Sequence, residues 1–163
     1  MILGTHTIST PDEMHELGRA LGAVLRAGDV LVLTGELGAG KTTLTRGIGD
    51  AMNVRGPVTS PTFVLARTHP SLGGGAPLVH VDAYRLSSPV ELDDLDIDFA
   101  HSVVVVEWGA GMLEGITDSW LDVVIDRPVG ATAGELGDEL VEPRTVTITA
   151  HGSKWAELAG AGS

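Results

Sequence analysis

The feature that most constrains this chain is the glycine-rich segment GELGAGKT at residues 35–42. It follows an apolar run at 30–33 and precedes a stretch in which apolar residues recur at helical spacing. A buried strand, a glycine-rich turn and a helix in this order are typical of a phosphate-binding loop, whose backbone N–H groups hold a polyphosphate. An ordinary glycine-rich turn is disfavoured, because Lys41, one of only two lysines, lies in the motif. We therefore expect a nucleotide site.

Four polar residues have predicted roles at this site. Lys41 would reach the β- and γ-phosphates, and the Thr42 hydroxyl would bind Mg²⁺. Asp82 follows a segment at 78–81 that reads as a strand, and Glu107 follows the apolar run at 103–106, which reads as a buried strand. Ligands of open α/β sheets bind outside the carboxyl ends of the strands, so both acids are expected to meet the loop in one crevice. The alternative for each acid is a solvated residue at the end of a strand.

The remaining pattern mixes strands and helices and predicts an α/β sandwich. A helix is expected from Pro11, with Thr10 as its N-cap and Glu13 completing a capping box. A short acidic helix is expected at 89–95. Strands are expected at 2–8, 30–33, 63–66, 78–81, 103–106, 121–125 and 145–149, the last two nearer an edge because they alternate. One domain is expected over 1–163, with a loop insertion at 129–143, a terminal helix at 153–159 and a frayed tail at 160–163.

Composition narrows the function classes. The chain has no cysteine, which excludes a disulfide framework, a thiolate zinc site and a cysteine nucleophile. Its formal net charge is −12, so most of the surface should repel nucleic acid, and we expect no DNA partner. No apolar stretch approaches the roughly 18–20 residues of a membrane span, and we expect no membrane partner or signal peptide. The expected compartment is the cytoplasm.

Four sequence blocks together resemble one bacterial family. They are the loop at 35–43, SPTF at 60–63, HVDAYRL at 80–86 and VEWG at 106–109. In this order they are similar to the TsaE (YjeE) family, the ATPase of tRNA threonylcarbamoyladenosine synthesis. The loop is generic, whereas the other three blocks are specific in combination.

The resemblance implies a P-loop NTPase-like three-layer sandwich with a mixed, mainly parallel sheet that binds ATP and Mg²⁺. It also implies weak ATP hydrolysis that depends on the partner proteins TsaB and TsaD. Those partners transfer a threonylcarbamoyl group to adenosine 37 of tRNAs that read ANN codons, so tRNA would be met indirectly, through the complex.

The resemblance also assigns residues. It implies that Lys41, Asp82 and Glu107 are catalytic, and that Thr42 and Glu107 hold the metal. Ser60, Pro61, Thr62 and Trp108 resemble the family's switch or partner-contacting segments. The implied nucleotide-binding residues are Gly35, Gly38, Ala39, Gly40, Lys41, Thr42 and Thr43, with Thr10 and Pro11 near the base.

Alternatives remain open at this point. A P-loop small-molecule kinase would use the same loop, but its lid arginines have no visible cluster. A guanine-specific switch would need an [NT]-K-x-D segment, which is absent. A nucleotide-dependent assembly module overlaps with the family's function. His80 is interpreted as a structural hydrogen-bonding residue rather than a base, and the acidic run at 91–98 as a solvated face or a docking surface.

Overall fold

The structure, a computed structural model, describes residues 3–35, 40–54, 66–83, 89–93, 97–108, 113, 117, 119–126 and 144–152. Three helices and seven strands lie in these ranges. They are β1 (Gly4–Ile8), α1 (Pro11–Val24), β2 (Val30–Gly35), α2 (Lys41–Met52), β3 (Ala66–His69), β4 (Leu78–Asp82), α3 (Pro89–Asp93), β5 (Val103–Glu107), β6 (Trp120–Asp126) and β7 (Arg144–His151). None of the described helices is long and apolar enough to cross a membrane.

All seven strands form one mixed sheet in the order β1-β7-β6-β2-β5-β4-β3. The four central strands β6, β2, β5 and β4 are parallel, and β1, β7 and β3 add antiparallel pairs at the two sides. The parallel centre aligns the carboxyl ends of β2, β4 and β5, because Leu33 and Asp82 both pair with Glu107. The mixed α/β sheet that the sequence predicts is therefore confirmed.

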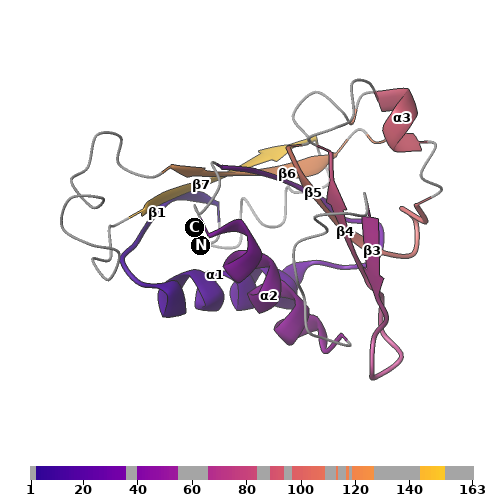
Figure 1. Cartoon of the computed structure of the whole chain (residues 1–163), viewed down its shortest axis with the longest axis horizontal. Coiled ribbons are helices and arrows are strands. Elements are labelled where there is room, and N and C mark those ends of the chain that lie inside the picture. The colour runs from indigo at the N-terminus through magenta and orange to yellow at the C-terminus, as the bar shows by residue number, and fades with distance from the viewer. Residues whose placement is uncertain are drawn as a thin grey trace.

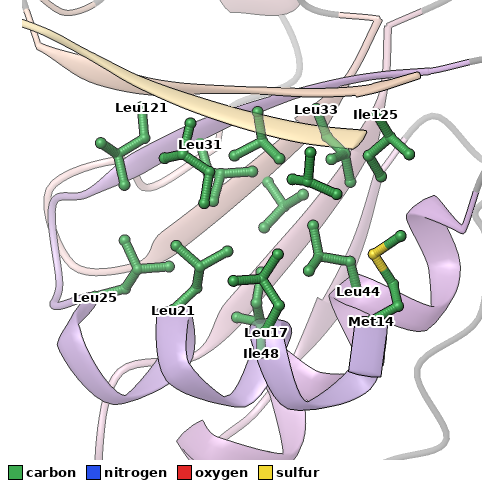
Figure 2. Close-up of a cluster of buried hydrophobic side chains, with 14 of the residues drawn as sticks. Met14, Leu17, Leu21, Leu25, Leu31, Leu33, Leu44, Ile48, Leu121 and Ile125 are labelled. Carbon is green, nitrogen blue, oxygen red and sulfur yellow. The ribbon is translucent and has the colours of Figure 1, made fainter. Parts of the chain in front are cut away.

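Helices α1 and α2 lie side by side against one face of the sheet (Figure 1). Alternate residues of β2 and β6 point to this face, where they meet one stripe of each helix. Figure 2 shows Leu21 of α1 and Leu44 of α2 directed toward the sheet, where Leu31 and Leu33 of β2 lie, and all four side chains are fully buried. Full burial of a leucine or isoleucine stabilises the fold by roughly 1.5–3 kcal/mol, so this layer holds α2 firmly on the sheet.

The opposite face carries a second, smaller apolar cluster. The other alternate residues of the parallel strands, such as Val32 and Val106, pack there with Leu92 of α3 and with Leu113. Ile97 and Phe99 are partly buried against the same cluster. The central strands are thus apolar on both faces, as continuous valine and leucine runs predict.

Glycines set the contact between α1 and α2. A Cβ atom on Gly47 would lie 2.1 Å from the backbone oxygen of His15, and one on Gly18 would lie 2.1 Å from the backbone oxygen of Leu44. Real side chains do not approach backbone atoms this closely, so the two helices touch through their backbones at these positions. No local pattern in the sequence predicts this contact, because it joins two different helices.

The sequence-based boundaries are largely confirmed, with one shift. Thr10 caps α1 by accepting a hydrogen bond from Glu13 N at 3.1 Å, and Pro11 opens the helix. The strand expected at 63–66 is found at Ala66–His69 instead, and 63–65 fall outside the described residues. The register with β4 sets this position, since Ala66 pairs with Val81 and His69 with Leu78. The middle of β3 is exposed and carries no apolar signal.

The alternating strands β6 and β7 do lie toward one side of the sheet, third and second from the β1 edge. Both are paired on two sides, so their alternation reflects one covered face rather than an open edge. The predicted helix at 89–95 is found at Pro89–Asp93. The insertion at 129–143, the terminal helix at 153–159 and the tail at 160–163 lie outside the described residues.

Candidate functional site

The two ends of the phosphate loop are well defined. Gly35 ends β2, and Gly40 is the N-cap of α2 with φ at +113°. A Cβ atom on Gly40 would also lie 3.1 Å from Met14 Cε of α1. Backbone conformation and close packing therefore both favour glycine at this position. Gly40 has no side chain with which to cap α2, so within the described residues no side-chain cap engages the first-turn N–H groups.

Lys41, the first residue of α2, turns its side chain back toward the end of β2. Its Nζ donates a hydrogen bond to the Gly35 carbonyl oxygen at 2.6 Å. Nζ also lies 3.7 Å from Glu107 Oε1 and 4.1 Å from the centroid of the Trp108 ring. A carbonyl oxygen, a carboxylate and an aromatic face thus surround the buried ammonium group. This positive charge sits where a polyphosphate would meet the loop.

Glu107 and Asp82 end neighbouring strands, as predicted. Glu107 is buried at the end of β5, and Asp82 is half-buried opposite it at the end of β4. The backbone joins the two strand ends just beyond them, where Ala83 N donates to Glu107 O at 2.9 Å. Glu107 therefore meets Lys41 directly, and the register places Asp82 beside Glu107.

His80 is a member of this cluster that the sequence analysis placed outside the site. It is fully buried on β4, and its Nε2 forms a hydrogen bond with Glu107 Oε2. The prediction of a hydrogen-bonding role is confirmed. Its position on the same strand face as Asp82 was visible in the sequence, but its partner on β5 was not.

Trp108 has an unusual backbone conformation. Its φ is +61°, and its N donates to the Leu33 carbonyl oxygen of β2 at 2.9 Å. A left-handed conformation at a bulky residue costs roughly 1–2 kcal/mol. This strained turn holds the indole ring over Lys41, which fits the prediction that Trp108 belongs to the functional region.

Thr10 and Pro11 lie at the start of α1, and Met14 in the next turn contacts the loop end at Gly40. The Thr10 hydroxyl is engaged in capping. Beside this helix start is a pocket of about 390 Å³, lined by His6, Thr7, Ile8, Asp12, Glu13 and Glu16. The structure thus brings the predicted base-binding segment near the loop, with a pocket adjoining it.

The remaining predicted site residues lie partly within and partly outside the described ranges. Thr42 and Thr43 lie half-buried in the first turn of α2, next to Lys41. Gly38 and Ala39 of the loop lie outside the described residues. So do the predicted switch residues Ser60, Pro61 and Thr62.

The donors present fit a magnesium–nucleotide complex. Among the residues that the structure describes, no three histidine, aspartate or glutamate side chains gather into a metal cluster. Mg²⁺ usually takes one or two protein carboxylates and fills its other positions with waters and substrate phosphates. One carboxylate at Glu107 and one hydroxyl at Thr42, beside a cationic loop, match that requirement.

A mixed sheet with a parallel centre, whose central strand is followed by a glycine-rich sequence and a helix that begins with a buried lysine, defines a P-loop NTPase-like fold. The family model for the threonylcarbamoyl adenosine biosynthesis protein TsaE matches residues 8–131. With three quarters of its length matched in this way, the chain belongs to the TsaE family.

Individual relatives agree with this assignment. The tRNA threonylcarbamoyladenosine biosynthesis protein TsaE of Streptomyces coelicolor is 59% identical over 146 residues, covering 88% of this chain and 94% of that protein. The protein of the same name from Bacillus subtilis is 34% identical over 151 residues, covering 91% and 86%. The crystal structure of Bacillus subtilis YdiB matches with a TM-score of 0.72 and 29% identity, covering 96% of this chain and 91% of that one.

Proposed function

We propose that this chain is the ATP-binding and ATP-hydrolysing subunit required for threonylcarbamoylation of adenosine 37 in tRNAs that read ANN codons, and that it acts in the cytoplasm with TsaB and TsaD. The observation that carries the nucleotide part is the buried Lys41, held between Gly35, Glu107 and Trp108 at the phosphate loop. Family membership supports the pathway. In this proposal hydrolysis by the isolated chain is weak and rises in the complex.

Each polar residue of the site has its own role in this proposal. Lys41 pairs with the β- and γ-phosphates, and the Thr42 hydroxyl and the Glu107 carboxylate hold Mg²⁺. When bound, the metal neutralises the charge that develops on the phosphates. Asp82, next to Glu107 in the sheet register, orients the attacking water.

Substitution of the two acids should have different effects, on ATP binding for Glu107 and on hydrolysis for Asp82. We expect Glu107→Ala to weaken Mg²⁺-dependent ATP binding by between about tenfold and a hundredfold, because a charge-assisted contact contributes roughly 1.5–3 kcal/mol. We expect Asp82→Ala to lower complex-stimulated hydrolysis more than it lowers binding. Calorimetric titration with ATP, with and without Mg²⁺, and ATPase assays with TsaB and TsaD check both.

Glu107→Gln is the matched control for folding, because its amide oxygen can still accept a hydrogen bond from His80 while the charge is lost. If binding and stimulated hydrolysis both survive a substitution, the role proposed for that residue is wrong. Phosphate transfer to a metabolite in a panel assay would instead support a small-molecule kinase.

A second prediction concerns RNA and partner binding. With a net charge of −12, little counterion release is available to this surface. We therefore expect the isolated chain to bind tRNA no more tightly than about 10⁻⁴ M. Association with TsaB and TsaD should depend on ATP and should weaken in Trp108→Ala, because Trp108 contacts the phosphate-binding lysine. Filter binding with tRNA and pull-down with the two partners measure these outcomes.

Trp120→Ala is the matched control. Trp120 begins β6, at the amino end of the parallel strands, and stacks on His151 with ring centroids 5.0 Å apart. It should leave partner binding unchanged. Tight, salt-sensitive binding of tRNA by the isolated chain would contradict the proposal, as would partner association that is indifferent to both ATP and Trp108.

A further inference from the structure

We propose that His80 is a positioning residue that holds the Glu107 carboxylate in the orientation needed to bind Mg²⁺, an inference that rests on the nucleotide site proposed above. Three observations carry it: the bond from His80 to one carboxylate oxygen, the direction of the other oxygen, and the burial of an imidazole between the apolar residues Val79 and Val81 of β4.

The two carboxylate oxygens of Glu107 have different neighbours. Oε2 is bonded to His80 Nε2, whereas Oε1 lies 3.7 Å from Lys41 Nζ. A carboxylate can only accept, so Nε2–H must donate. Rotation about the last side-chain bond of a glutamate is broad and soft. The bond to His80 therefore selects one orientation, with Oε1 facing the loop.

Burial makes a purely structural role a poor explanation. His80 has 0% of its surface exposed, and among the described residues its Nδ1 has no hydrogen-bond partner. An unmet hydrogen bond on a buried group costs roughly 1–3 kcal/mol, and an apolar residue of similar size would avoid that cost. Leu78, Val79 and Val81 on the same strand are all buried and apolar.

A carboxylate that binds a metal is usually held by a second hydrogen bond from the protein, and loss of that partner typically lowers metal affinity by about 10–100-fold. His80 is such a hydrogen-bonding partner of Glu107. It touches neither the phosphate-binding lysine nor the loop in any described contact. Its effect should therefore appear in metal binding rather than in nucleotide binding without metal.

The test compares His80→Gln with His80→Asn. The glutamine amide nitrogen lies the same number of bonds from Cβ as Nε2, and the asparagine nitrogen the same number as Nδ1. Only glutamine can reach Glu107. Electron paramagnetic resonance of Mn²⁺, titrated into the ATP complex, measures metal affinity directly. We expect a loss of about 10–100-fold in His80→Asn and substantial recovery in His80→Gln, with metal-free ATP affinity changed less than about twofold in both.

His69→Asn is the matched control, since His69 is another buried histidine, on β3, opposite the start of β4. It should leave Mn²⁺ affinity unchanged. Wild-type Mn²⁺ affinity in folded His80→Asn would overturn the inference, as would an equal loss in His80→Gln and His80→Asn. Failure of the wild-type chain to bind ATP would overturn the proposed function instead.

A measurement on the intact chain covers the case in which the His80 variants do not fold. Long-range ¹H–¹⁵N spectra of the wild type should show a protonated Nε2 on His80, protected from exchange with water. This signal should shift strongly in Glu107→Gln. A proton on Nδ1 instead, or an Nε2–H signal indifferent to Glu107→Gln, would overturn the inference.

Discussion

Gly47→Ala is expected to lower the free energy of unfolding by about 3 kcal/mol, the upper end of the usual range for overpacked sites. The new Cβ would lie 2.1 Å from the His15 backbone oxygen and 2.9 Å from the Arg19 backbone nitrogen. Neither atom belongs to a flexible side chain, so α1 and α2 must separate. For a chain of this size the melting temperature should fall by roughly 6–12 °C, which thermal unfolding followed by circular dichroism will measure.

The close helix contact and helix propensity predict opposite changes in the free energy of unfolding of Gly47→Ala. Alanine is favoured over glycine inside a helix by about 1 kcal/mol, so helix propensity alone predicts that Gly47→Ala stabilises the chain. Gly73→Ala is the control outside the helix contact, because the one described side chain that its Cβ would meet is Asn53, at 3.4 Å. We expect that change to stay within about 0.5 kcal/mol of wild type. A melting temperature of Gly47→Ala at or above that of wild type would contradict the close helix contact.

Lys41→Ala is expected to abolish productive ATP binding. Lys41 is the only lysine among the described residues, and its Nζ lies at the phosphate loop within 2.6 Å of the Gly35 carbonyl oxygen. Each charge-assisted contact that it makes to a phosphate is worth roughly 1.5–3 kcal/mol, and two such contacts correspond to about two to four orders of magnitude in affinity. Equilibrium titration with ATP measures the loss.

Folding has to be separated from binding in this variant. Removal of Lys41 leaves the buried Glu107 without the cation 3.7 Å away, and an uncompensated buried charge destabilises a fold. The double variant Lys41→Ala/Glu107→Gln removes both charges and serves as the folding control. Lys154→Ala, at the only other lysine of the chain, is the control for loss of a positive charge. Normal ATP affinity in folded Lys41→Ala would contradict the phosphate-loop assignment.

The sequence by itself determined the features that depend on local geometry. The buried strand that ends at Gly35, the helix that begins at Lys41, the cap at Thr10 and the position of Asp82 and Glu107 at strand ends are all confirmed. Such features are visible because glycine freedom, capping chemistry and apolar periodicity act within a few residues of chain. The same locality explains why the shifted strand β3 was misplaced, since its middle is exposed and its register depends on β4.

Which distant side chains meet depends on how the strands are ordered and aligned in the sheet. His80 and Glu107 are 27 residues apart, and they meet because β4 and β5 are neighbours in parallel register. The ring of Trp108 lies over Lys41 because a backbone bond to β2 holds a left-handed turn. Strand order and register are long-range properties, and no local pattern specifies them. The positions of the loop and of the strand-end acids could therefore be predicted from single segments, whereas the hydrogen bond between His80 and Glu107 emerged only once the sheet was assembled.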